Sequence, residues 1–70
     1  MQRFGEKLRT LRMQQGWSMA QLAPKLGVTR AYIGRMERGE KTPNAAMILK
    51  IANLFDVCTD RLMRDEVDLN

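Results

Sequence analysis

Apolar side chains recur at helical spacing along almost the whole chain, and this periodicity constrains the fold more than any other feature. Phe4, Leu8 and Leu11 lie at positions i, i+4 and i+7 of a first predicted helix. Near the other end, the same kind of stripe contains Ile48, Ile51, Ala52 and Phe55. No stretch alternates apolar and polar residues with a period of two, so the pattern predicts an all-α fold.

Glycine and helix-capping residues divide the chain into short segments. The first helix is predicted to run to about Gln15, before Gly16. Ser18 then forms a capping box with Gln21 and starts a second helix, which ends at Gly27.

Further cap signals predict three more helices. Thr29 is an N-cap candidate for a third helix that ends at Gly39, and Asn44 is one for the fourth. A short fifth helix is expected to start within residues 57–60 and to carry Leu62 and Met63. Five helices with short links make one compact domain over residues 1–70.

Pro24 conflicts with this pattern because it lies six positions after the Ser18 cap. It removes the hydrogen bond to the Ala20 carbonyl and nominally costs about 3 kcal/mol inside a helix. We expect a local bend there, or a helix that frays by one turn.

Composition excludes several classes of function. The sequence has no His, and Cys58 is its only cysteine. A disulfide framework, a Cys/His zinc site and imidazole-based catalysis are therefore excluded. We expect no enzyme, no cofactor, no metal and no small-molecule ligand. No signal peptide or membrane span is apparent, and the single thiol fits the cytoplasm.

Charge is distributed unevenly along the sequence. Residues 1–55 contain ten basic and three acidic residues, a net charge of +7. Residues 56–70 contain two basic and five acidic residues, a net charge of −3. A basic body with an acidic end is typical of a polyanion-binding protein. Charge alone also fits a solvated basic surface.

The second and third predicted helices form a helix-turn-helix arrangement over about residues 18–38. A ten-residue helix is about 15 Å long and can enter the major groove, which is about 12 Å wide. Ile33 and Met36 are expected to bury one face of the third helix. Its bare face offers Arg30, Ala31, Tyr32, Gly34, Arg35 and Arg38. Because arginine is the commonest specific reader of guanine, this face is a candidate DNA-reading surface.

Several spaced motifs over roughly residues 4–63 resemble the Cro/repressor-type helix-turn-helix domain. This is the lambda-repressor-like, or XRE, family of bacterial and phage regulators. The motifs are Gly16-Trp17-Ser18, Gln21-Leu22-Ala23, Leu26-Gly27-Val28-Thr29, Tyr32-Ile33, Glu37-Arg38-Gly39, Pro43, Lys50-Ile51-Ala52 and Val57 through Leu62. The resemblance implies a compact five-helix lambda-repressor-like fold that binds double-stranded DNA.

The resemblance also implies roles for individual residues. Base edges would be contacted by Arg30, Ala31, Tyr32 and Arg35. Phosphates would be contacted by Arg12, Ser18, Met19, Thr29, Arg38, Lys41 and Thr42. A partly buried ion pair with Glu37 is the alternative role of Arg12. For Arg30 and Arg35 the alternative is a merely solvated side chain, and for Tyr32 it is packing.

Four residues depart from the family pattern. Met19 stands where many members have Gln, so any phosphate contact there must come from its backbone N–H. Glu40 carries negative charge toward the expected phosphates, unless it pairs with Lys41 or Arg38. Asp56 stands where the family commonly has Gly, and Asp tolerates the left-handed conformation expected there at modest cost. Cys58 replaces a small polar cap, and we expect a half-buried inert thiol there rather than a redox switch.

The expected assembly is a homodimer, because one recognition helix covers only about four to six base pairs. Residues 58–70, the fifth helix and the acidic end, are the predicted dimer segment. Its apolar side chains, with one from the fourth helix, are Phe55, Leu62, Met63, Val67 and Leu69.

The leading functional hypothesis is a stand-alone transcriptional regulator, a repressor that binds a palindromic operator. One alternative is a restriction–modification controller that activates as well as represses. Another is an antitoxin or protein-interaction module that uses the same fold.

Overall fold

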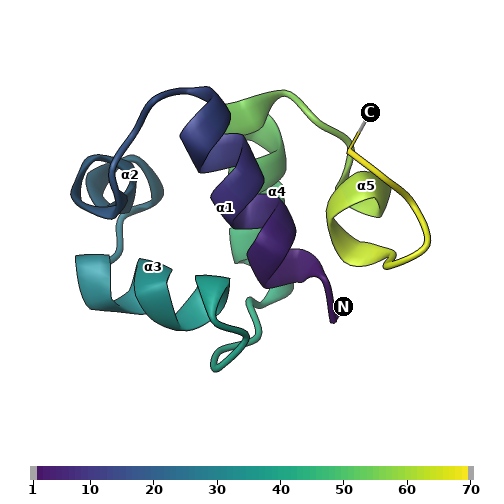
Figure 1. Cartoon of the computed structure of the whole chain (residues 1–70), viewed down its shortest axis with the longest axis horizontal. Helices are drawn as coiled ribbons and strands as arrows, with labels where there is room; N and C mark the ends of the chain where they lie inside the picture. Colours follow the sequence, from purple (N-terminus) through teal and green to yellow (C-terminus); the bar gives the residue numbers. More distant parts are fainter. Residues whose placement is uncertain (1, 70) are drawn as a thin grey trace.

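The computed structural model describes residues 2–69, which contain five α-helices and no strand (Figure 1). The helices are α1 (Phe4–Gln14), α2 (Met19–Leu26), α3 (Arg30–Glu37), α4 (Ala45–Phe55) and α5 (Thr59–Met63). The all-α, five-helix prediction is therefore confirmed. Within the described residues, no helix is long and apolar enough to cross a membrane.

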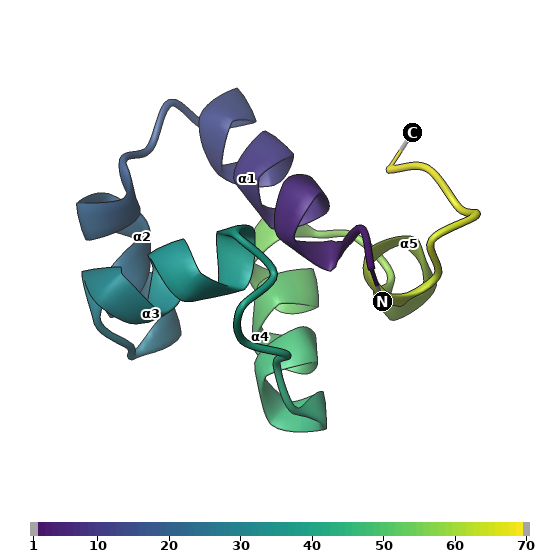
Figure 2. The ribbon, with the colours of Figure 1, turned by 60° about the horizontal axis from the view of Figure 1, so that its bottom comes forward.

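Helices α1 and α4 lie between two smaller groups of elements (Figures 1 and 2). On one side, α2 packs on α3, while α1 contacts α3 and α2 contacts α4. On the other side, α5 packs against both α1 and α4 and is followed by the C-terminal segment. The α2–α3 pair is therefore held from behind by the two longest helices, and its outer side faces solvent.

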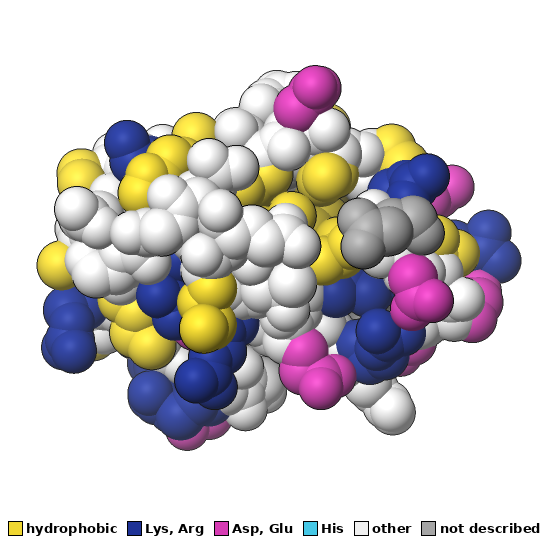
Figure 3. Space-filling view, turned by 45° about the horizontal axis from the view of Figure 1, so that its top comes forward, with side chains coloured by type: hydrophobic (Ala, Val, Ile, Leu, Met, Phe, Trp, Pro, Cys, Tyr) yellow, Lys and Arg dark blue, Asp and Glu magenta, His cyan; other side chains and the backbone are white. Residues whose placement is uncertain are grey.

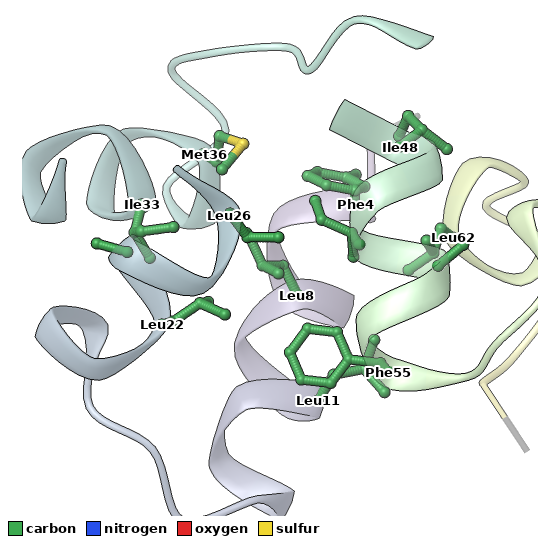
Figure 4. Packing of buried hydrophobic residues seen from close by; sticks show 13 residues of the cluster. Phe4, Leu8, Leu11, Leu22, Leu26, Ile33, Met36, Ile48, Phe55 and Leu62 are labelled. Atoms are coloured by element: carbon green, nitrogen blue, oxygen red, sulfur yellow. The ribbon is translucent and has the colours of Figure 1, made fainter. Parts of the chain in front are cut away.

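The core contains the apolar stripes that the sequence predicts (Figure 4). Each helix contributes at least one side chain to it, because every helix has one apolar face. Burial of a large aliphatic or aromatic side chain contributes about 1.5–3 kcal/mol. The buried residues are Phe4, Leu8, Leu11, Leu22, Ala23, Leu26, Ile33, Met36, Ile48, Ile51, Ala52, Phe55 and Leu62.

The ends of α1 and α4 follow the local signals. Beyond the C-terminus of α1, Gly16 has φ 75°, a left-handed conformation that glycine adopts without a steric penalty. The Asn44 side chain caps α4 by accepting a hydrogen bond from the Met47 N–H at 2.9 Å. Asp56 ends α4 with φ 55° and ψ 48°. The left-handed conformation predicted for Asp56 is confirmed.

Pro24 does not fray the end of α2, so that alternative is wrong. The helix continues to Leu26, and the Pro24 carbonyl accepts a hydrogen bond from the Gly27 N–H at 3.2 Å. Pro24 and Ala20 are both exposed. Water can therefore solvate the Ala20 carbonyl that lacks its helical partner, which reduces the cost of the proline.

Lys7 is buried, with only 2% of its surface exposed, although the sequence places it in the basic body. Its ammonium group donates hydrogen bonds to the carbonyl oxygens of Arg61, Arg64 and Val67, each at 2.6 Å. These carbonyls lie at the end of α5 and in the segment after it. Lys7 thus ties α1 to the C-terminal segment, and its charge is not on the basic surface.

The acidic end of the chain is also bound to the residues just before α1. The Asp65 carboxylate accepts hydrogen bonds from the backbone N–H groups of Gln2 and Arg3 at 3.0 and 2.8 Å. These bonds, that of Arg3 first, lower the pKa of Asp65. The Arg3 guanidinium forms an ion pair with Asp68 at 3.3 Å. Asp65 and Asp68 therefore have partners within their own chain.

Candidate nucleic-acid interface

Side-chain caps fix the starts of α2 and α3, and a glycine ends α2 before the turn between them. At the start of α2, Ser18 Oγ accepts from the Gln21 N–H at 3.1 Å, and the Ser18 N–H donates to Gln21 Oε1 at 2.8 Å. Gly27 ends α2 in a left-handed conformation, with φ 71°. Thr29 Oγ1 then accepts from the Tyr32 N–H at 3.1 Å and caps α3. The predicted capping box and the predicted Thr29 cap are both confirmed.

Helix α3 has one buried face and one exposed face. Ile33 and Met36 are fully buried. Arg30, Ala31 and Arg35 are exposed, and Tyr32, beside them, is half-buried. The structure therefore brings together the four residues predicted to contact base edges, on the outer side of the α2–α3 pair.

Gly34 lies one helical turn after Arg30 on α3, but the prediction that it is bare is wrong. It is buried, because the Arg38 guanidinium and the Met19 sulfur lie over it. A Cβ atom at position 34 would lie 3.0 Å from Arg38 Nη1 and 3.7 Å from Met19 Sδ. The missing side chain thus lets Arg38 fold back along α3.

Arg12 and Glu37 form the ion pair that the family resemblance implies. Arg12 Nε and Nη2 donate to the two Glu37 carboxylate oxygens at 2.7 and 3.0 Å, with only 11% and 3% of the side chains exposed. Arg12 Nη1 also donates to the Trp17 carbonyl at 2.8 Å. The Glu37 hydrogen bond, which outweighs desolvation, raises the pKa of Arg12. Arg12 therefore joins three elements: α1, the link before α2 at Trp17, and the end of α3 at Glu37. Its phosphate contact stays a prediction.

A second contact fixes α3 against α1. A Cβ atom at Gly5 would lie 2.5 Å from the Glu37 carbonyl oxygen and 2.6 Å from that of Met36. Only glycine allows α1 to approach the backbone of α3 so closely. The orientation of α3 is thus set by the Gly5 contact and by the buried ion pair.

The residues predicted to contact phosphates lie at three places around α3. Ser18 and Thr29 are exposed at the starts of α2 and α3, and Met19 is half-buried. Backbone N–H groups in the first turn of a helix have no acceptor inside the helix and suit an anion. Arg38, Lys41 and Thr42 are exposed in the turn after α3. These phosphate contacts stay predictions.

Glu40 pairs with Arg38, one of the two partners foreseen for it. The distance from Arg38 Nε to Glu40 Oε2 is 2.8 Å. This hydrogen bond, supported by the attraction of the two charges, raises the pKa of Arg38 and lowers the pKa of Glu40.

Basic side chains gather over the side of the molecule that α2 and α3 form (Figure 3). Over α5 and the C-terminal segment they alternate with acidic ones. The sequence analysis predicts this asymmetry, although Lys7 contributes nothing to it.

The dimer interface was predicted to contain five residues, and two of these assignments are wrong. Leu62 is fully buried and Phe55 is 9% exposed, because both pack in the core of their own chain. Val67 and Leu69 are half-buried, and Leu69 packs against that core. Met63, which is 42% exposed, remains available to a partner.

An apolar groove that no sequence motif indicated lies beside Met63. The groove has a volume of about 360 Å³ and is lined by Pro43, Ala45, Ile48, Leu49, Thr59 and Met63. Leu49 is 55% exposed. It lies outside the buried stripe of α4, and an apolar residue on the polar face of a helix is the signal that could have revealed it.

Cys58 is exposed, so the expected half-buried thiol is wrong. It occupies the N-cap position of α5 and makes no side-chain capping bond.

Comparison with known proteins assigns this geometry to a family. A helix-turn-helix family model matches residues 8–62. Among curated relatives, the HTH-type transcriptional regulator SutR of Escherichia coli is 44% identical over 50 residues, which are 71% of this chain and 28% of SutR. The chain spans 28% and 56% of the first two curated relatives it matches.

Two solved structures are similar over nearly their whole length. The restriction–modification controller protein C.AhdI from Aeromonas hydrophila is 37% identical with a TM-score of 0.78, covering 89% of this chain and 94% of C.AhdI. The P22 c2 repressor protein, solved with a synthetic operator, is 27% identical with a TM-score of 0.82, covering 90% and 96%.

Proposed function

This chain belongs to the Cro/repressor-type helix-turn-helix family of transcriptional regulators, and from that premise we propose that it is a repressor of transcription. In this proposal it binds a palindromic operator in double-stranded DNA as a homodimer. The protein then works in the cytoplasm, on the nucleoid. No catalytic step is proposed.

The exposed face of α3 carries this proposal. Arg30, Ala31 and Arg35 project from a helix whose other face is buried, and the width of an α-helix matches that of the major groove. The buried Arg12–Glu37 pair and the Gly5 contact hold the helix in one orientation. A fixed helix with bare arginines can form paired hydrogen bonds to guanine O6 and N7.

A controller of restriction–modification genes is the second candidate. The likeness to C.AhdI, which extends over 94% of that protein, favours it. Both candidates bind DNA through α3, and they differ in the sign of regulation. A reporter gene behind the bound site separates them: repression alone supports the repressor, and activation at low protein concentration supports the controller.

Selection of bound sequences from a random duplex pool tests the DNA-binding proposal. We expect a palindrome whose half-sites lie about 34 Å apart, one turn of the duplex. If each subunit neutralises about four phosphates, log affinity falls with log salt at a slope near −7 for the dimer. Recovery of no preferred sequence would contradict sequence-specific binding.

Arg35→Ala tests the base-reading role of α3. We expect the variant to lose about 1–3 kcal/mol of binding free energy and to relax the preference at one base position. Uniform weakening on all sequences would instead make Arg35 a phosphate ligand.

The groove beside Met63 supports the homodimer. Leu49 and Met63 are exposed apolar residues on adjacent helices, and self-association would remove both from water. A two-fold axis through this surface repeats α3 on a second subunit. We therefore place the proposed interface at the start of α4 and at α5, rather than at Phe55 and Leu62.

Leu49→Glu tests this interface, with Met13→Glu as its control. Met13 is 58% exposed on α1, so the control introduces the same charge on an apolar residue away from the groove. We expect sedimentation to show a dimer for wild type and Met13→Glu, and an 8.1 kDa monomer for Leu49→Glu. A wild-type monomer at tens of micromolar, with or without operator, would overturn the homodimer.

A further inference from the structure

The turn that follows α3 contains an ion pair in which both charges reach solvent. Arg38 Nε and Nη2 face the Glu40 carboxylate at 2.8 and 3.4 Å. The Arg38 side chain is 58% exposed and that of Glu40 is 53% exposed. Arg38 Nη1 lies over Gly34. The guanidinium is thus held beside the recognition helix, with one edge occupied by a carboxylate.

Glu40 occupies the Nε–Nη2 edge of Arg38, one of the two edges through which arginine can bind a phosphate group. Arginine presents two parallel N–H donors to a carboxylate or to a phosphate, and one edge serves only one such anion at a time. In the proposed complex, Arg38 faces the DNA backbone beside Arg35. The Arg38–Glu40 pair must then open, or Glu40 must remain close to a phosphate of the same sign. Either outcome weakens the contact between Arg38 and the phosphate.

We propose that Glu40 is an internal competitor for the phosphate-binding edge of Arg38. The proposal rests on the DNA-binding function proposed above and adds a residue that sets the strength of backbone contact. Phosphate contacts are independent of sequence. Glu40 therefore lowers the affinity of the protein for every duplex. The binding free energy that remains depends more on the contacts between α3 and the bases.

Glu40→Gln tests the competitor role, because glutamine keeps the size of the side chain and removes its charge. An exposed ion pair changes an equilibrium by about 1.4- to 5-fold, and the two pairs of a dimer by about 2- to 30-fold. We expect the variant to bind both the selected operator and an unrelated duplex tighter by this factor. The salt slope should steepen by about one per subunit, while the preferred sequence stays unchanged.

Glu66→Gln is a matched control. Glu66 pairs with Arg64 at 2.8 Å, with the same spacing of two residues and with 65% and 58% of the side chains exposed. It lies in the C-terminal segment, so the control makes the same change of net charge away from α3. An equal gain from both variants would reduce the effect to net charge and overturn the proposal.

The Arg38→Ala background separates competition from direct repulsion. There we expect Glu40→Gln to gain no more affinity than Glu66→Gln does. A gain that persists without Arg38 would mean that Glu40 acts by repelling phosphate, which overturns the competitor role.

An NMR titration of the free protein tests the pair without DNA. In Arg38→Ala, we expect the pKa of Glu40 to return upward toward its ordinary value, and no change would overturn the pairing. A wild-type protein that binds no duplex would overturn the proposed function and the competitor role together. Wild-type binding with no gain in Glu40→Gln would overturn the competitor role alone.

Discussion

The buried ammonium group of Lys7 offers the sharpest test of how this fold is stabilised. Three carbonyl oxygens of the C-terminal part, each 2.6 Å away, accept its hydrogen bonds. Lys7→Met keeps the length of the apolar stem and removes the charged donor. The three carbonyls then lose the donor that they share.

The size of the effect follows from these bonds. Three hydrogen bonds from a charged donor contribute about 4.5–9 kcal/mol together. Burial of the ammonium group costs several kcal/mol of hydration, which methionine avoids. We therefore expect Lys7→Met to lower the free energy of unfolding by about 2–4 kcal/mol. A 70-residue domain has about 3–10 kcal/mol in total, and such a loss lowers Tm by about 10–30 °C.

Thermal and urea unfolding, followed by circular dichroism, measure this loss. Lys50→Met is the control, because Lys50 is exposed and the substitution changes net charge equally. Hydrogen exchange should also show that the Arg64 and Val67 amides lose protection in Lys7→Met but not in the control. A Lys7→Met variant within about 0.5 kcal/mol of Lys50→Met, the usual range of surface substitutions, would refute the reasoning.

Three further variants probe contacts that orient α1 and α3. Gly5→Ala places a Cβ 2.5 Å from the Glu37 carbonyl oxygen, so thermal unfolding should show a loss of about 1–3 kcal/mol or more; an unchanged Tm would contradict this close approach. Glu37→Gln leaves Arg12 without its charge partner and should cost about 3–5 kcal/mol in urea unfolding, with a much smaller loss counting against the pair. Hydrogen bonds from the backbone N–H groups of residues 3 and 2 lower the pKa of Asp65. The ionised carboxylate therefore stabilises the folded state at pH values above the ordinary pKa of 3.8, and this contribution is lost as the pH falls through the lowered pKa. Unfolding measured from about pH 5 to pH 2 should therefore lose less stability in Asp65→Asn than in wild type, and parallel curves would exclude this contribution.

Features that depend on neighbouring residues were predicted correctly from the sequence. The Ser18–Gln21 capping box and the Thr29 cap involve residues three apart. The apolar stripes of α1 and α4 depend on spacings of three and four. The exposure of Arg30 and Arg35 on α3 follows from the same periodicity, and their contact with bases stays a prediction.

Periodicity and capping signals do not reveal which side chains pair with a distant part of the chain, and the Arg12–Glu37 pair was expected only through the family resemblance. Lys7 lies 54 residues from Arg61 in sequence, yet these two residues are bonded. Lys7 lies at position i+3 of the apolar stripe that begins at Phe4, so helical spacing places it on the buried face of α1 but does not identify its partners. Phe55 and Leu62 were assigned to a dimer surface because periodicity shows which residues are apolar, and does not show which apolar residues their own chain covers.

The sequence by itself determined the five helices, their caps, the apolar stripes and the bare arginines of α3, because helical periodicity and capping are local interactions. The tertiary structure alone decided which charges remain on the surface and which apolar residues remain exposed. Lys7 and Asp65 are used to join the two ends of the chain, while Leu49 and Met63 are left facing solvent. These outcomes depend on how the helices pack, since burial and long-range pairing are properties of the assembled fold.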